Sequence, residues 1–387
     1  MIQLLLLDYK KLSGLYIHIP FCRKACNYCD FHFSTQLDPM DRMVDGLAKE
    51  LRLRSSTPKS PIDTIYFGGG TPSILTEKAL DTLMETITTY YNVSRSAEVT
   101  LEANPDDIDA DKAKFWKRAG INRLSIGIQT FNDKVLKVLN RSHNSNQALK
   151  SIDWVRQAGF HNISADLMFA LPEASDASLR ADLKTLLNLD LPHLSIYGLI
   201  IEEKTVFSHW KIQNKRSFPS DLDYERNYRI VHEELTKYQY EHYEISSFTK
   251  NAHFSRHNTS YWLQNPYLGI GPGAHSFDGD NRSHNISNNQ LYLKQLDTGR
   301  AHPVVEALSL TEKMNEYIMT RLRTHFGLDF EQFEKKFHRD IKNEHLVLID
   351  QLCSEGFAFL DLNKLKLTFE GFLISDDICA RLFYPTS

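Results

Sequence analysis

Short apolar runs alternate with amphipathic stretches along the first half of the chain. The runs are rich in β-branched and aromatic residues and end at Pro, Gly or Asn, which is typical of buried strands. Between them, apolar residues recur every three or four positions, which is typical of helices packed on one side. The predicted strands are 16–19, 63–67, 97–102, 123–128, 162–168 and 193–198. The predicted helices are 41–54, 77–90, 111–119, 148–158 and 179–189.

This alternation predicts an α/β fold with a parallel sheet, because parallel strands need a crossover connection between them. The periodicity alone does not decide whether that sheet is open or closed. From Thr311 the pattern changes to three helices and a hairpin, which predicts a small winged-helix-like domain. We therefore expect a first domain at 1–296, a linker at 297–310 and a C-terminal domain at 311–387.

Composition narrows the class of protein. The chain has 387 residues, is 42% hydrophobic and 24% charged, and carries a net charge of −4, which is ordinary for a globular protein. The negative net charge argues against a zinc-stabilised nucleic-acid binder that uses the C-terminal domain, which is the weakest of the functions considered. The apolar run Leu4–Leu7 lacks the basic flank of a signal peptide, and no stretch approaches the ~20 apolar residues of a membrane span.

The strongest chemical signal is a cysteine motif directly after the first predicted strand. Cys22, Cys26 and Cys29 follow a Cys-x3-Cys-x2-Cys spacing, and three adjacent thiols cannot all form disulfides with one another. Thiolates favour soft metal centres, and three of them leave one iron of a 4Fe–4S cluster open. A zinc site completed by His18 or His32 is the structural alternative, and three thiols without metal are another. With five cysteines in all and no disulfide framework, we expect a cytoplasmic protein.

Several polar residues lie at or near predicted strand ends, where barrels of parallel strands place their ligands. The glycine run before Thr71 is either a tight turn or a close approach to a ligand. Glu102 can accept hydrogen bonds from a diol or simply be solvated, and Asp166 lies in an apolar strand, so it is paired or functional. Arg141 is a candidate for a carboxylate partner or an ordinary surface residue.

A second constellation lies further along the chain, where His257 is followed by Asn258, Tyr261 and Trp262. An imidazole can bind heme iron, and aromatic rings can form flat walls for a porphyrin. A single histidine is more often an ordinary hydrogen-bonded residue. His275, in a glycine-rich segment, is a second and weaker candidate.

The segment His-Ile-Pro-Phe-Cys, followed by Cys-x-Tyr-Cys-Asp-Phe, resembles the oxygen-independent coproporphyrinogen III oxidase family of the radical S-adenosylmethionine (SAM) superfamily. The His-Asn-x-x-Tyr-Trp segment is similar to the signature of the heme chaperones of that family, the HemW type. The resemblance implies an open three-quarter (β/α)6 TIM-like barrel over most of 15–296. It also implies a 4Fe–4S cluster on the three cysteines. It implies SAM contacts from Tyr16, Tyr28, Gly69, Gly70, Thr71, Glu102, Gln129, Arg141 and Asp166.

Two departures from the oxidase favour the chaperone branch. The oxidase carries a fourth cysteine where this chain has Phe31, and it has a longer segment before the first strand. The leading hypothesis is a heme chaperone that carries the cluster and SAM and delivers heme to an unidentified acceptor protein. The alternative is a coproporphyrinogen III oxidase that uses SAM for oxidative decarboxylation. An electron donor and transient contact with a membrane protein are compatible with either hypothesis. Cys353 and Cys379 fit no metal spacing, and we expect them to be structural.

Overall fold

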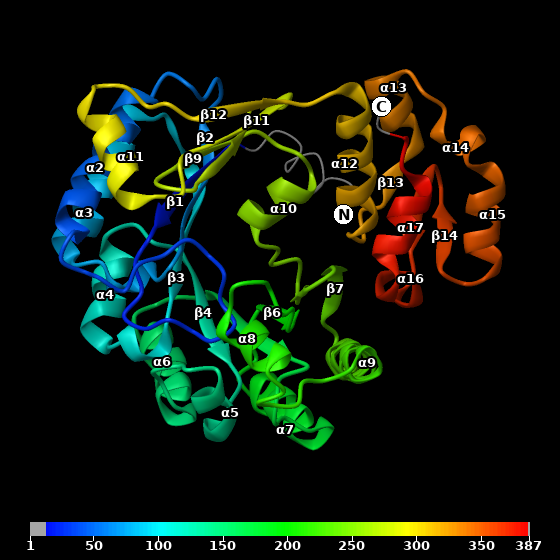
Figure 1. Cartoon of the computed structure of the whole chain (residues 1–387), viewed down its shortest axis with the longest axis horizontal. Helices are drawn as coiled ribbons and strands as arrows, with labels where there is room; N and C mark the ends of the chain where they lie inside the picture. Colours follow the sequence, from blue (N-terminus) through cyan, green and yellow to red (C-terminus); the bar gives the residue numbers. More distant parts are fainter. Residues whose placement is uncertain (1–12, 386–387) are drawn as a thin grey trace.

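The computed structural model describes residues 13–385 as two packed parts. Figure 1 shows a sheet wrapped by helices on the left and a smaller, mostly helical part around the C-terminus on the right. The run Leu4–Leu7 lies outside the described residues. Among the residues that are described, no helix combines the length and apolar character needed to cross a membrane.

The six predicted strands are present, and they form the parallel centre of one large sheet. They are β1 (Gly14–Ile19), β2 (Ile62–Gly69), β3 (Val93–Ala103), β4 (Arg123–Gln129), β5 (Asn162–Phe169) and β6 (His193–Gly198). Each strand pairs in parallel with the next in the chain, so their carboxyl ends lie at one rim. The predicted α/β class and parallel core are therefore confirmed.

The covering helices follow the strands in sequence and lie outside the sheet (Figure 1). They are α2 (Met40–Leu53), α3 (Glu77–Tyr90), α4 (Ala110–Arg118), α6 (Ser145–Gln157) and α7 (Asp176–Asn188). Helix α2 buries Met43, Val44, Leu47 and Leu51, which are the periodic residues that predicted it. The sequence pattern did not predict the short α5 (Asp133–Val138) or the long α9 (Asp221–Lys237).

Alternation along the parallel strands separates an apolar outer face from a polar inner face. In β4, Leu124 and Ile126 join the hydrophobic core, whereas Arg123 and Ser125, which alternate with them, are buried polar residues. The same alternation places Glu102 of β3 and Asp166 of β5 on the inner side. Glu102 lies opposite Ser125 in register, and Asp166 lies opposite Gly127 and accepts a hydrogen bond from Ser125. The barrel interior is thus a polar lumen, which is the part of the fold available for chemistry.

The sheet is larger than predicted, because six short strands extend it on both sides. On the side of β1 lie β9 (Tyr267–Ile270), β10 (His275–Phe277), β11 (Asn281–His284) and β12 (Val304–Ala307), and on the side of β6 lie β8 (Ser247–Thr249) and β7 (Glu241–Glu244). These strands are too short to show a period of their own, and their partners are distant in sequence. The stretch 297–310, expected to be a linker, contains the last residue of α11 (Asn289–Asp297) and the edge strand β12.

The C-terminal part has the expected helices and hairpin. A three-stranded sheet of β13 (Leu328–Asp329), β15 (Lys364–Leu367) and β14 (Ala358–Asp361) packs with α12 (Leu310–Leu322), α13 (Phe330–Phe337), α15 (Leu346–Ser354), α16 (Phe369–Leu373) and α17 (Ser375–Leu382). It docks along the β7 edge of the large sheet, where the backbone of His325 donates to Tyr243 across 2.8 Å. Edge strand β7 is therefore covered by the C-terminal domain.

Candidate cofactor and heme sites

The three cysteines lie on the loop between β1 and α2, at the carboxyl rim of the barrel. The Thr71 hydroxyl donates to the Cys22 sulfur across 3.2 Å, and the Arg141 guanidinium donates to the Cys26 sulfur across 3.4 Å. Burial raises the pKa of Cys22 to about 11 and that of Cys29 to about 12. Metal binding at this loop must therefore release protons from the thiols, and the two donors are suited to stabilise the resulting thiolate ligands.

The histidines that a zinc site would need are engaged elsewhere. His18 Nδ1 lies 3.0 Å from the Tyr16 hydroxyl, and its Nε2 lies 2.8 Å from the carbonyl oxygen of His32. The His32 ring itself contacts Asn289 at 2.8 Å. Over residues 13–385, no three Cys, His, Asp or Glu side chains converge on one metal position. A cubane places each cysteine on its own iron, so this spread donor set fits a 4Fe–4S cluster better than a closed tetrahedral zinc site.

The glycine run lies directly beside the cysteine loop. Gly70 donates its backbone N–H to Ile19 across 2.9 Å, and a Cβ at Gly70 would come within 2.5 Å of the Phe21 carbonyl oxygen. Gly69 has a φ of +108°, a conformation that side chains disfavour. Both glycines are thus needed to bring the end of β2 against the loop that follows β1. This close approach leaves a rim of backbone polar groups where the SAM amino group is predicted to bind.

Two carboxylates face the lumen below this rim. The Tyr66 hydroxyl donates to Glu102 across 2.7 Å, and Ser125 donates to both oxygens of Asp166 at 3.1 and 3.2 Å. Burial raises the pKa of Glu102 to about 7 and that of Asp166 to about 6, although the hydroxyl donors oppose the shift. Buried carboxylates with few donors are suited to accept hydrogen bonds from a ligand such as a ribose diol.

Arg141 is buried beside the cysteine loop and keeps one donor without a partner in the structure. One terminal nitrogen donates to Asn104 at 2.6 Å and to the Gly127 carbonyl at 2.8 Å, while its buried Nε has no partner in the structure. An unpaired buried donor is costly, so this atom is suited to an acceptor supplied by a bound group. Gln129 lies nearby at a bulge between β4 and β5, with a φ of +68°. The structure thus brings together the predicted SAM residues, and these observations fit that cofactor.

Tyr28 is covered by a helical segment that the sequence pattern did not predict. Helix α8 (Val206–Ile212) is tied to the cysteine loop by the backbone N–H of Phe207, which donates to the Asn27 carbonyl across 3.0 Å. The Phe207 and Tyr28 rings are 6.4 Å apart. Phe207 is fully buried in a small apolar cluster beside the main core. The segment containing α8 therefore covers the cysteine loop on the side of β5 and β6.

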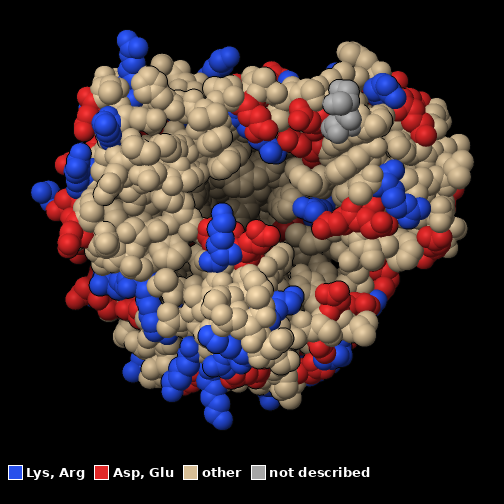
Figure 2. All heavy atoms as spheres, viewed as in Figure 1, with Lys and Arg blue, Asp and Glu red and all other residues tan. Residues whose placement is uncertain are grey.

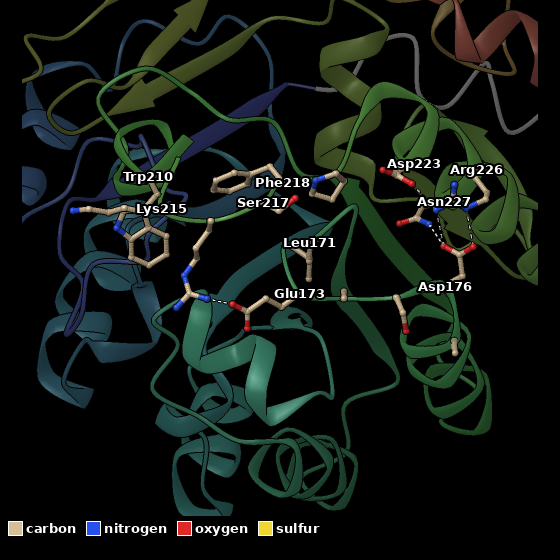
Figure 3. Close-up of a pocket in the computed structure, with 15 residues that line it drawn as sticks. Leu171, Glu173, Asp176, Trp210, Lys215, Ser217, Phe218, Asp223, Arg226 and Asn227 are labelled. Atoms are coloured by element: carbon tan, nitrogen blue, oxygen red, sulfur yellow. Dashed lines mark hydrogen bonds and ion pairs between the residues drawn. The ribbon is translucent and has the colours of Figure 1, made fainter. Parts of the chain in front are cut away.

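A large cavity of about 1170 Å³ lies beside the segment containing α8, between the loop after β5 and residues 210–219. Figure 3 shows Trp210 and Phe218 on one side and Asp176, Arg226 and Asn227 on the other. Arg226 is bound to Asp176 at 2.7 Å, and Arg216 pairs with Glu173. These two ion pairs are internal to the protein, and of the basic residues that line the cavity Lys215 has no ion pair with any described residue.

The His-Asn-x-x-Tyr-Trp segment forms helix α10 (Arg256–Trp262), and it is divided between two environments. His257 is 1% exposed and enters the barrel, where Nδ1 lies 2.8 Å from the Thr64 hydroxyl and Nε2 lies 2.7 Å from the Tyr261 hydroxyl. Both ring nitrogens are therefore occupied. In this conformation, the structure does not present His257 as the open iron ligand that we expected.

Tyr261 and Trp262 instead line a cleft between the barrel and the C-terminal domain. The cleft has a volume of about 400 Å³ and adjoins a second cavity of about 730 Å³. Figure 2 shows a hollow between the two parts, with mostly uncharged walls and charged residues at its rim. The aromatic residues that line the cleft are Tyr197, Tyr261, Trp262, Tyr267 and Phe277. His275 lies on the same strand as Phe277 but faces solvent beside His284, with ring centroids 5.3 Å apart.

Several residues that support these sites were not singled out from the sequence. Asn104 joins Thr71 to Arg141, because its side chain contacts both at 3.5 and 2.6 Å. Tyr66 holds Glu102, and Arg123 is buried in the lumen with two nitrogens that have no partner in the structure. The alternation of side chains along a strand could have predicted that Tyr66 and Arg123 face the lumen, because every second residue points to the inner face.

Comparison with known proteins agrees with this arrangement. Residues 16–186 match the radical SAM superfamily, and residues 308–374 match the HemN C-terminal domain. The chain is 34% identical over 371 residues to a heme chaperone HemW of Bacillus subtilis, covering 95% of this chain and 98% of that protein. It is 33% identical over 370 residues to the heme chaperone HemW of Lactococcus lactis, covering 95% and 97%.

Among solved structures, the coproporphyrinogen III oxidase HemN of Escherichia coli superposes with a TM-score of 0.84. The match covers 98% of this chain and 92% of HemN, at 23% sequence identity. At that identity the likeness establishes the fold, which is the expected TIM-like partial barrel with a C-terminal domain.

Proposed function

The chain belongs to the HemW family of the radical SAM superfamily, and we propose that it binds heme in the cleft between its barrel and its C-terminal domain and passes it to an acceptor protein. The aromatic lining of that cleft is the observation that carries the proposal. Ligand pockets for flat, largely apolar molecules are concave, mostly apolar and aromatic, and have a few polar groups at their edges.

The placement of the family's aromatic pair supports this assignment. Tyr261 and Trp262 come from one helix of the barrel part, and the opposite wall includes Thr320 of α12. A heme in the cleft would therefore contact both parts of the protein. Because the walls come from different parts, a small change in their relative position would open the cleft and release the ligand to an acceptor.

The cofactors of the superfamily are assigned to the lumen and carboxyl rim of the barrel, which the His257 ring connects to the cleft residue Tyr261. Cys22, Cys26 and Cys29 would hold the 4Fe–4S cluster, which supplies one-electron reduction chemistry when bound. The SAM contacts would come from the residues at and below the carboxyl rim, namely Tyr16, Tyr28, Gly69, Gly70, Thr71, Glu102, Gln129, Arg141 and Asp166. All five cysteines are free, in keeping with a reducing cytoplasm as the working compartment.

The iron ligand is the part of the proposal that needs a conformational change. For His257 to bind iron, its hydrogen bonds to Thr64 and Tyr261 must open, and the ring must leave the barrel. His275 is already exposed, but it does not line the cleft. We therefore assign the walls of the site to Tyr261 and Trp262, and keep His257 ahead of His275 as the proposed ligand.

Coproporphyrinogen III oxidation is the second candidate function, because the whole fold superposes on HemN. The residue against it is Phe31, which stands where the oxidase carries a fourth cysteine and whose side chain is largely exposed beside the cysteine loop. The chain therefore offers three cysteines at this loop.

One experiment separates the two candidates. The protein is reconstituted anaerobically with iron and sulfide, and the same preparation is assayed for saturable heme binding and for turnover of coproporphyrinogen III with SAM and a reductant. We expect one heme per chain and no decarboxylation. Robust formation of protoporphyrinogen would overturn the chaperone proposal in favour of the oxidase.

A further inference from the structure

The proposed heme cleft has one basic side chain in its lining. Among the described residues that line it, Arg282 of β11 is the sole Lys or Arg, and Glu316 of α12 is one of two carboxylates, with Glu244. Heme carries two propionate carboxylates, and burying a carboxylate without a partner is costly. A site of this kind therefore needs a cation at the edge where the propionates lie, and Arg282 is the residue placed to supply it.

Arg282 is anchored by its place in the sheet. It lies opposite Phe277 of β10 and opposite Glu306 of β12 in the antiparallel register. Phe277 lines the cleft together with Arg282, so the guanidinium extends beside an aromatic wall. Its side chain is 43% exposed, which places it at the mouth of the cleft rather than in its depth.

In the structure described here, a carboxylate of the protein already occupies this guanidinium. Arg282 Nη2 lies 3.0 Å from Glu316 Oε1, and the Glu316 side chain is 16% exposed. Partial burial raises the pKa of Glu316, with Arg282 as the main opposing influence. The ionised form of Glu316 therefore depends on Arg282. A carboxylate held in this way can be displaced from the guanidinium by another carboxylate.

We propose that Arg282 binds a porphyrin propionate, and that Glu316 holds its place until heme enters. The assignment rests on the proposed heme function and adds the recognition of the carboxylate edge. The pair also joins two parts of the molecule, because Arg282 belongs to the sheet extension and Glu316 belongs to α12 of the C-terminal domain. A propionate that binds Arg282 would displace Glu316 and break this ion pair. Binding of heme would therefore also release the contact between the sheet extension and α12.

The neighbouring pair between Lys313 and Asp280 provides a matched control. It crosses the same seam at 3.1 Å, from α12 to the turn between β10 and β11, but neither residue lines the cleft. Removing it tests the loss of a bridging charge without changing the proposed propionate contact.

The test compares hemin with hemin dimethyl ester, whose carboxylates are blocked, on the full-length protein. Wild type should bind hemin about tenfold or more tightly than the ester, as expected for one charge-assisted hydrogen bond. Arg282→Gln should lose most of that preference by weakening hemin alone. Glu316→Gln should bind hemin a few-fold more tightly, because the competing carboxylate is gone, and Lys313→Gln should behave as wild type. Circular dichroism of each variant checks that the fold is retained.

The outcomes separate this assignment from the function on which it rests. If wild type shows no saturable binding of hemin, the heme proposal and the Arg282 assignment both fail. If wild type binds hemin but Arg282→Gln keeps the full preference over the ester, Arg282 is not the propionate contact. Tighter hemin binding by Lys313→Gln, equal to that of Glu316→Gln, would show that loosening the seam explains the gain without any exchange of carboxylates.

Discussion

Arg141 donates a hydrogen bond to the sulfur of Cys26 across 3.4 Å. The same guanidinium contacts Asn104 at 2.6 Å, and Asn104 contacts Thr71, the residue that donates to Cys22. Two of the three predicted cluster ligands are thereby linked through side chains that come from different strand–helix connections. This network therefore positions the cysteine loop through contacts made by the protein itself.

We expect Arg141→Gln to weaken SAM binding by about tenfold or more and to reduce retention of the cluster. The neutral amide removes a charged donor that reaches Cys26 and the Gly127 carbonyl at once. Isothermal titration of reconstituted protein with SAM, together with iron analysis, measures both effects. Arg118→Gln, at an exposed position of α4, is the control and should change neither. Equal SAM affinity in the two variants would contradict the assignment.

Replacing Cys26 by Ser should abolish the brown absorbance of the reconstituted protein and its acid-labile sulfide. The reason is that three thiolates are the minimum that holds the cluster while one iron stays open. Cys353→Ser is the matched control, since that thiol is half-buried in the C-terminal domain and far from the cysteine loop in sequence. Wild-type protein that contains one zinc and no sulfide would show that the site is a zinc site instead.

SAM affinity should fall as the pH is lowered through 7. Burial raises the pKa of Glu102 to about 7, so at lower pH the carboxylate is protonated and accepts hydrogen bonds poorly. Titrations at pH 8 and pH 6 should differ by about tenfold in wild type, and Glu102→Gln should show weak binding at both values. A pH dependence that survives in the variant would assign the titration to another group, such as Asp166.

The same raised pKa has the opposite consequence for stability. A carboxyl whose folded pKa lies above its unfolded value of 4.5 favours the folded state when it is protonated. The contribution of Glu102 is complete below that unfolded value and is lost as the pH rises through about 7. Thermal melts of the protein without cofactors should therefore show that Glu102→Gln gains stability relative to wild type at pH 8 and less at pH 4.

His257→Ala should destabilise the fold by about 2–4 kcal/mol, because it removes a buried ring and leaves Thr64 without its partner. It should also weaken heme binding, since Tyr261 loses the contact that holds it in the cleft wall. Tyr261→Phe keeps the aromatic wall and is the control. If His257 binds the iron, its loss shifts the Soret band as well; lower affinity with an unchanged band would leave His257 a residue that positions Tyr261.

Glu50 should contribute more to stability than any surface carboxylate. It is fully buried in α2 and accepts hydrogen bonds from Arg54, Tyr292, Asn285 and the backbone N–H of Gly271, at 2.6 to 3.1 Å. Glu50→Ala should cost about 3–5 kcal/mol, because it removes the buried carboxylate that balances the Arg54 charge and accepts from three other donors. Urea unfolding measures the loss, and Glu77→Ala, at an exposed position of α3, is the control. A loss below 1 kcal/mol, on the order of a surface pair, would contradict this role.

The sequence by itself determined the parallel core and the cluster. Residues 123–128 and 193–198 were predicted as strands and lie in β4 and β6. A buried strand can be predicted in this way because it consists of a short run of mostly apolar residues that are adjacent in the chain. The cysteine spacing is also local, so one loop carries the whole predicted metal site. Such features depend on residues that are adjacent in the chain, and local patterns are sufficient to reveal them.

Tertiary structure alone decided how the distant segments meet. The strands β9 to β12 are too short for a period and are defined by long-range pairing, as when Leu15 pairs with Leu268. The contacts of His257 were decided in the same way: its motif predicts an iron ligand, and the fold places Thr64 and Tyr261 against its two ring nitrogens. The cleft, and the pairing of Arg282 with Glu316 at its mouth, exist only because α12 packs against the sheet extension. Hydrogen bonds and walls built from residues so far apart leave no local trace in the sequence.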